Sequence, residues 1–426
     1  MKASLSNFHS MRFCTNLWAT IIVLSILNIV SLSPCLHARE NDVKFDRLTN
    51  QDGLSNNNVF SITQDARGFM WFGTLGGLNR YDGNEYKVYH HDPDDAGSLS
   101  VGLIRQILVD RKGNLWIGTW TAGLNKFDAA TEQFVRFQYD SENPDSLSDN
   151  AIRAIYEDHE GVLWVGTQSQ GIDALVPDTG KFVHYPHDPN NASSLSHQHV
   201  EVIYEDSKGV LWIGTHGGGL NRFDRATQQF AHYRHDPDDP SSLAHNDVRA
   251  IYEDHTGTLW VGTWGGGLNK FDRNSETFFR YQHDPSNPRS VSDNNIRPIY
   301  EDRTGILWIG TSGGGLNWFD RETGTFSRFQ HDRDDPNSLS HDHTRALYED
   351  RTGTIWIGTM GGGVNKYDPQ QHQFQSVRMG SDDFEGLPQT PVFSFQKDHK
   401  GLLWLGTNGG GLVSFEQKTD TVVHYR

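Results

Sequence analysis

Cysteine is almost missing from this 426-residue chain, and both copies, Cys14 and Cys35, lie within the first 38 residues. The remainder therefore has no thiol for a disulfide, and its stability has to come from packing. Lipid attachment at Cys35 is disfavoured, because Pro34 stands where a small residue normally precedes a lipidated cysteine.

Basic residues are also in short supply, with 37 Lys and Arg against 54 Asp and Glu and a formal net charge of −17. Residues 1–38 contain only Lys2 and Arg12 as charged side chains apart from histidine, so the formal charge without them is −19. Because phosphate groups are repelled by such a chain, nucleic acid and anionic lipid are not predicted partners.

Long apolar runs are absent except at the N-terminus, where Leu17 to Leu36 is mostly apolar and follows the two basic residues. This order is typical of an export signal, and Ala38 fits a cleavage site. An uncleaved membrane anchor is the alternative. We expect residues 1–38 to be a signal peptide or anchor, and residues 39–426 to form a periplasmic or extracellular domain.

A repeat dominates those remaining residues. Fragments of the form L-W-I-G-T place tryptophans 45 residues apart once and 48 residues apart thereafter, at Trp71, Trp116, Trp164, Trp212, Trp260, Trp308, Trp356 and Trp404. A period of 48 is too long for most helical repeats and fits one four-stranded blade of a β-propeller.

The unit from Val248 to Tyr281 shows the order of elements within a repeat. Four short β-rich segments are separated by a turn at Asp254 to Gly257, a glycine turn at 265–267 and a polar turn. The segments are apolar on both faces, as expected for blades packed between neighbours. The sequence predicts an all-β propeller of four-stranded antiparallel blades.

The number of blades in the ring stays open. Residues Lys44 to Leu48 match the fourth strand of a unit, such as Gln133 to Phe137, and can complete the last blade. Thr421 to Tyr425 is a further fourth strand, giving nine for eight units, and the linker from Met379 to Pro391 departs from the pattern. An eight-bladed ring and seven blades plus the first blade of a second ring both fit.

The combination Y-E-D-x-x-G-x-L-W-I-G-T-x-G-G-G-L-N-x-F-D resembles the two-component regulator propeller repeat over about residues 45–426. The resemblance implies an exported sensor region, often for carbohydrate, that signals through a membrane helix and a histidine kinase or diguanylate cyclase. Residues 1–426 contain none of those parts, so we expect a sensor without its own transmitter and with a membrane-bound signalling protein as a partner.

One position varies in every unit of an otherwise uniform repeat. It lies between the G-T and the glycine turn, on the end of the blade that also carries the connections between blades, and reads Leu75, Trp120, Gln168, His216, Trp264, Ser312, Met360 and Asn408. Variation of this kind suits an asymmetric binding surface, with tryptophans stacking on sugar faces and polar residues forming hydrogen bonds. Tolerance of an exposed loop tip is the alternative explanation.

Arginine recurs at the start of the innermost strand, at Arg105, Arg153, Arg249, Arg297 and Arg345, with Phe60, Glu201 and Phe393 breaking the series. If these side chains face inward they form a cationic collar suited to carboxylate or sulfate, and an anionic oligosaccharide is a natural ligand. Pairing with carboxylates of the next blade is the alternative.

Other recurring polar residues are interpreted as structural. The His-Asp-Pro histidines His91, His187, His235 and His283 are one blade apart and cannot converge on one ion. Glu253 and Asp254 recur in most units, whereas a catalytic pair should be singular. No G-x-S-x-G, H-E-x-x-H or G-K-[ST] pattern stands apart from the repeat. No catalytic residue, metal site or cofactor is predicted.

The sequence therefore predicts an extracytoplasmic propeller that senses a small molecule or oligosaccharide. A protein-interaction scaffold that uses the same face is the first alternative. A polysaccharide lyase or hydrolase is the second.

Overall fold

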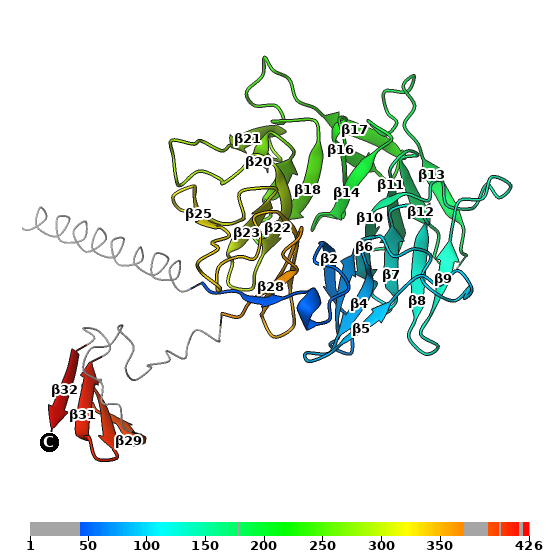
Figure 1. Cartoon of the computed structure of the whole chain (residues 1–426). Helices are drawn as coiled ribbons and strands as arrows, with labels where there is room; N and C mark the ends of the chain where they lie inside the picture. Colours follow the sequence, from blue (N-terminus) through cyan, green and yellow to red (C-terminus); the bar gives the residue numbers. More distant parts are fainter. Residues whose placement is uncertain (1–42, 178, 370–390, 400–401, 417–420, 426) are drawn as a thin grey trace, which may run out of the picture. The chain divides into compact units, whose positions relative to one another are not determined.

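The computed structural model describes residues 43–177, 179–369, 391–399, 402–416 and 421–425 (Figure 1). The expected signal or anchor at residues 1–38 lies outside them. The chain divides into two compact units, Met1–Asp368 and Pro369–Arg426. Within the described residues, no helix has the length and apolar character needed to cross a membrane.

The first unit holds seven four-stranded antiparallel sheets, which we call blades 1 to 7. Blades 1 and 2 are β2 (Val59–Gln64), β3 (Met70–Thr74), β4 (Gly77–Tyr81) and β5 (Tyr86–Tyr89), then β6 (Ile104–Val109), β7 (Leu115–Thr119), β8 (Leu124–Asp128) and β9 (Gln133–Phe137). Blades 3 and 4 are β10 (Ile152–Glu157), β11 (Leu163–Thr167), β12 (Ile172–Leu175) and β13 (Phe182–Tyr185), then β14 (Val200–Glu205), β15 (Leu211–Thr215), β16 (Gly219–Asp224) and β17 (Gln229–Tyr233).

Blades 5 and 6 are β18 (Val248–Glu253), β19 (Leu259–Thr263), β20 (Gly267–Asp272) and β21 (Thr277–Tyr281), then β22 (Ile296–Glu301), β23 (Leu307–Thr311), β24 (Leu316–Asp320) and β25 (Thr325–Phe329). Blade 7 combines β26 (Thr344–Glu349), β27 (Ile355–Thr359) and β28 (Val364–Tyr367) with the N-terminal β1 (Asp46–Leu48). A single 3-10 turn, η1 (Asn50–Asp52), follows β1.

The N-terminal strand closes the ring. β1 runs antiparallel to β28, with Asp46 opposite Lys366 and Leu48 opposite Val364. Blade 7 then packs on blade 1 through a buried cluster that includes Val59, Phe72 and Trp356. Clusters of this kind occur at all seven blade interfaces of the unit. The predicted closing strand is confirmed, and the ring has seven blades, so the eight-bladed alternative is wrong.

Each recurring tryptophan is anchored inside its own blade. The indole N–H of Trp260 donates to Asp254 in the preceding hairpin turn at 2.8 Å, and all eight units repeat this bond. The ring of Trp260 meets Phe319 of the next blade edge-on at 5.1 Å. The D-x-x-G-x-x-W turn therefore places one large aromatic side chain at each interface between blades.

The glycines of the repeat have two separate physical causes. A Cβ on Gly214, in L-W-I-G-T, would lie 2.6 Å from side-chain carbons of Val202 and Val248, so the next blade approaches too closely for any side chain. Gly267, in the glycine turn, has a φ of 78° and faces the carbonyl oxygen of Tyr281, a conformation that favours glycine.

The second unit holds the eighth sheet, made of β29 (Val392–Lys397), β30 (Leu403–Thr407), β31 (Gly411–Glu416) and β32 (Thr421–Tyr425). It repeats the tryptophan anchor, with Trp404 donating to Asp398 at 3.1 Å. The strand Thr421–Tyr425 pairs with β31 and takes no part in closing the ring. That this sheet is the first blade of a second ring stays a prediction.

Candidate ligand-binding site at the channel mouth

The variable position of each blade lies beside the start of the innermost strand. The backbone N–H of Trp120 donates to the carbonyl of Leu103, that of Gln168 to Ala151, and the other blades repeat the bond at 2.9–3.3 Å. We call this set of variable residues the rim. Because the innermost strands line the centre of the ring, the rim surrounds one mouth of the channel.

Immediately inside the rim, the start of the innermost strands forms the channel collar. Its seven members line one cavity of about 300 Å³, together with the residues that follow them: Phe60, Arg105, Arg153, Glu201, Arg249, Arg297 and Arg345. The five predicted arginines therefore converge on a common space. Rim side chains are not part of the cavity lining.

The rim nevertheless contacts the collar directly. The guanidinium of Arg153 lies over the ring of Trp120 at 4.7 Å and donates to Gln168. Arg297 lies over Trp264 at 4.6 Å, and its Nε is 3.3 Å from the hydroxyl oxygen of Ser312. One face of each predicted tryptophan is thus already used by an arginine.

The remaining rim residues divide between the two units. His216 lies 2.9 Å from Arg249 and 2.7 Å from Asp247. Met360, half-buried, pairs in the backbone with Asn58. Asn408 belongs to the second unit, where its N–H donates to Pro391, so it is removed from the rim of this channel.

Glu201 neutralises part of the collar. Its carboxylate contacts Arg249 of the next blade, and its second oxygen lies 3.2 Å from Arg105, two blades back. His199 Nε2 lies 2.9 Å from the same carboxylate. Burial alone would raise the pKa of Glu201, but His199 and the two guanidiniums outweigh it and hold that pKa well below its usual range.

The other three arginines have no carboxylate. Arg153, Arg297 and Arg345 form no ion pair with any described residue, and the guanidinium of Arg345 is held only over the Phe60 ring at 4.8 Å. Burial, followed by the charges of Arg249 and Arg105, lowers the pKa of Arg297 to about 9. Burial together with Arg105 and Arg297 also lowers the pKa of Arg345. Pairing with the next blade therefore explains Arg249 but not these three.

A second variable position was missed by the sequence reasoning. The residue just before each innermost strand reads Asn58, Leu103, Ala151, His199, Asp247, Asn295 and His343 around the ring. Asp247 pairs with Arg249, with Nε 2.6 Å from Oδ1, and His343 lies 3.0 Å from Ser312. Comparing the units at this position finds it, by the same reasoning that found the rim.

The repeated carboxylates at the opposite end of the blades are fully used by the fold. Glu253 accepts the backbone N–H of Ser207 in the preceding blade and pairs with Arg273 at 2.7 Å. Asp254 holds Trp260 and lies 3.1 Å from Arg321. This observation agrees with their interpretation as structural residues.

The His-Asp-Pro histidines are used by the linkers. His91, His187, His235 and His283 each place Nδ1 within 2.6–2.9 Å of a linker carbonyl eight residues on. Among the residues that the structure describes, no group of three or more His, Cys, Asp or Glu has an arrangement that would hold a metal ion.

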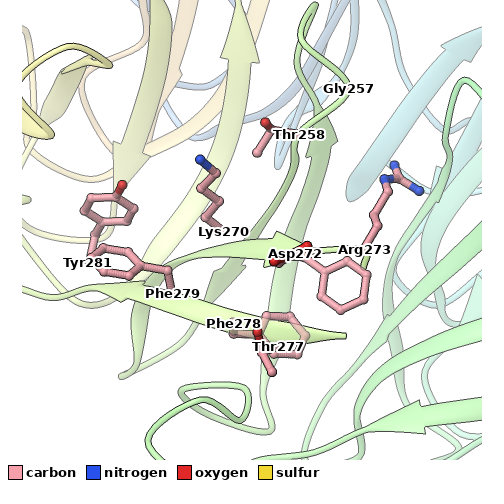
Figure 2. A pocket seen from close by; sticks show the side chains of 10 residues that line it. Gly257, Thr258, Lys270, Asp272, Arg273, Thr277, Phe278, Phe279 and Tyr281 are labelled. Carbon is pink, nitrogen blue, oxygen red and sulfur yellow. The ribbon is translucent and has the colours of Figure 1, made fainter. Parts of the chain in front are cut away.

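Two larger hollows lie on the outside of the ring. One, of about 650 Å³ on blade 5, is lined by Lys270, Arg273 and the exposed Phe279, whose ring lies 4.8 Å from Tyr281 (Figure 2). A hollow of about 580 Å³ occupies the equivalent place on blade 4. Their recurrence on successive blades marks them as a consequence of blade shape, whereas the channel mouth is unique in the ring.

The fold and mouth define a seven-bladed propeller with a polar, asymmetric channel. The model of the two component regulator propeller matches residues 53–76, 98–121, 146–169, 194–217, 242–265, 290–313, 338–361 and 386–409. The chain belongs to the family of proteins built from this repeat, and the resemblance inferred from the sequence is confirmed.

Similar proteins point the same way. The extracellular domain of the hybrid two-component system BT3049 from B. thetaiotaomicron is 32% identical, with a TM-score of 0.67 over 90% of this chain and 49% of that one. Histidine kinase P4 from Formosa agariphila is 38% identical over 78 residues, which are 18% of this chain and 6% of the kinase. The chain thus spans about half the length of the solved relative and a small part of the kinase.

A different propeller shares only the fold. Virginiamycin B lyase from Staphylococcus aureus is 17% identical, with a TM-score of 0.55 over 76% of this chain and 98% of the lyase. The chain is therefore of the same type as the extracellular domains of hybrid two-component sensors, and the lyase adds no functional information.

Proposed function

We propose that this propeller is the extracytoplasmic sensing part of a two-component-type signalling system and that it binds a carbohydrate at the channel mouth. The observation that carries the proposal is the meeting of the non-uniform rim with the arginine collar at one end of an otherwise regular ring. A membrane-bound signalling protein is the proposed partner that receives the signal.

The mouth offers the chemistry that sugar recognition needs. Trp120 and Trp264 are half-buried and held in place by arginines, so they present rigid aromatic surface at low entropic cost. The indole N–H of Trp120 is buried without a hydrogen-bond partner, and Gln168 and His216 are exposed. A cavity of about 300 Å³ is at the lower end of the range for ligand sites, which suits one or two sugar units.

The test is glycan binding by Trp120→Ala and Trp264→Ala variants, measured by calorimetry on a ligand first identified with a glycan array. We expect each variant to lose roughly 1–2 kcal/mol of binding free energy, about tenfold in affinity. Phe279→Ala, which removes an exposed aromatic ring on the outside of blade 5, is the matched control and should bind normally. Unchanged affinity in both tryptophan variants would reject the rim, and capture of a protein instead of a glycan would favour the scaffold alternative.

One contact favours a hydrolase as the second candidate. Ser312 Oγ lies 3.0 Å from His343 Nε2, which is nucleophile-to-base spacing, beside Arg297. However, burial and the charges of Arg345 and Arg297 lower the pKa of His343 to about 4, which makes it a weak base near neutral pH. Release of product from an anionic glycan or ester, abolished by Ser312→Ala, would establish this activity.

A further inference from the structure

The collar already shows how it holds an anion. The carboxylate of Glu201 is shared by Arg105 and Arg249, which come from blades 2 and 5, and its side chain is only 3% exposed. A carboxylate placed at this level is therefore bound by guanidiniums from different blades. Glu201 satisfies two of the five arginines and leaves the other three with neutral partners only.

The unsatisfied arginines are buried and face the cavity. Arg345, on blade 7, forms no hydrogen bond or ion pair with a described residue, and its Nε is buried without a partner. Arg297, on the neighbouring blade 6, has the hydroxyl of Ser312 and the ring of Trp264 as its polar and aromatic contacts. A buried charge without a counter-ion is costly, so these two side chains are set up to receive one.

We propose that Arg297 and Arg345, assisted by Arg153 across the channel, bind the carboxylate or sulfate group of a small acidic ligand. The inference rests on the proposed function, because it specifies the charge of the ligand at the same mouth. Guanidinium forks match planar carboxylates and the oxygens of sulfate, and a low local dielectric strengthens the contact. The cavity volume restricts the ligand to about the size of a monosaccharide or disaccharide.

The test uses the full chain and three probes: glucuronate, glucose and sodium sulfate, with sodium chloride matching the ionic strength. Affinity is measured by calorimetry and by the rise in melting temperature. We expect glucuronate and sulfate to bind and glucose to bind at least tenfold more weakly, because a charge-assisted hydrogen bond is lost with the carboxylate. Comparing glucuronate with sulfate distinguishes the two sources of the anion.

Four variants locate the site. Arg345→Gln and Arg297→Gln should each lower anion affinity about tenfold or more, whereas Arg222→Gln, which removes a surface arginine paired with Glu276, should have no effect. Glu201→Gln should raise anion affinity, because Arg105 loses its carboxylate. An increase cannot result from poor folding, so this variant keeps the inference testable if the arginine variants are unstable.

Equal affinity for glucose and glucuronate, or sulfate binding that survives Arg345→Gln, would overturn the inference. If neutral glycans bind through Trp120 while anions do not bind, the oxyanion site fails and the carbohydrate proposal stands. If anions bind through Arg345 and neither tryptophan variant changes any glycan affinity, the oxyanion site stands and the proposed rim fails.

Discussion

Replacing Glu201 with glutamine tests the electrostatic account of the channel. The substitution keeps the size of the side chain but removes the carboxylate that Arg105 and Arg249 share. Breaking a buried ion pair by removing one partner costs about 3–5 kcal/mol. Arg249 keeps Asp247, whose Oδ1 lies 2.6 Å from its Nε, so we expect the lower value, about 3 kcal/mol.

That free energy translates into a measurable change in thermal stability. With an unfolding entropy of about 2 cal/mol/K per residue, a ring of roughly 330 residues loses about 1.5 °C per kcal/mol, so Glu201→Gln should melt roughly 4 °C lower. Added sulfate should restore most of the loss, since a ligand at a hundred times its Kd contributes about 2.7 kcal/mol. Differential scanning calorimetry with and without sulfate, at constant ionic strength, measures both effects.

Acid should reduce the difference between wild type and Glu201→Gln. The pKa of Glu201 is lowered in the folded ring, so its stabilising contribution is fully present above the unfolded pKa of about 4.3 and is lost as pH falls below it. The matched control is Glu253→Gln, which breaks a buried pair with Arg273 outside the channel. It should lose stability without recovery in sulfate. A Glu201→Gln protein as stable as wild type, or one that sulfate does not restore more than wild type, would refute the reasoning.

Two further predictions concern the frame. Phe45→Ala should lower the free energy of unfolding by about 3–5 kcal/mol in denaturant titrations, because Phe45 is buried between blades 6 and 7 next to the closing strand; Asp46→Ala, exposed beside it, is the control, and similar losses in both would contradict the role of Phe45 in closure. Asp254→Asn should cost about 1–3 kcal/mol, because the buried carboxylate holds Trp260 and Arg321, whereas the exposed Asp272→Asn should change little; an unaffected Asp254→Asn protein would argue against the anchor.

The blade architecture could be predicted because it is encoded locally. The turn from Asp254 to Gly257 and the spacing of tryptophans fix each hairpin, and the match of residues 44–48 to a fourth strand identifies the closing segment before any coordinates. The number of blades could not be derived, because nine fourth strands compete for eight sheets. The choice is made by pairing between segments more than 300 residues apart, for which the sequence contains no local signal.

The site was predictable to a similar depth. The order of strands places the variable position and the recurring arginine at the same end of every blade, so their proximity follows from the repeat. Which arginines are neutralised does not follow, because Glu201 reaches both the next blade and Arg105 two blades back. The side-chain partners of the tryptophans were also not foreseen, since Arg153 and Arg297 occupy one face of each ring.

The distribution of charge along the blades gives the channel mouth its functional character. At the opposite end, buried carboxylates such as Asp158 and Glu205 share Arg225, so arginines and acids there satisfy one another. At the mouth, five arginines meet Glu201 and Asp247, and positive charge is left over within a chain whose net charge is −17. The acidic exterior disfavours long polyanions, which must pass close to it, whereas a small anion that fits inside the collar is affected mainly by the nearby guanidiniums. The same repeat thus produces a rigid, neutralised frame and one selective cationic opening.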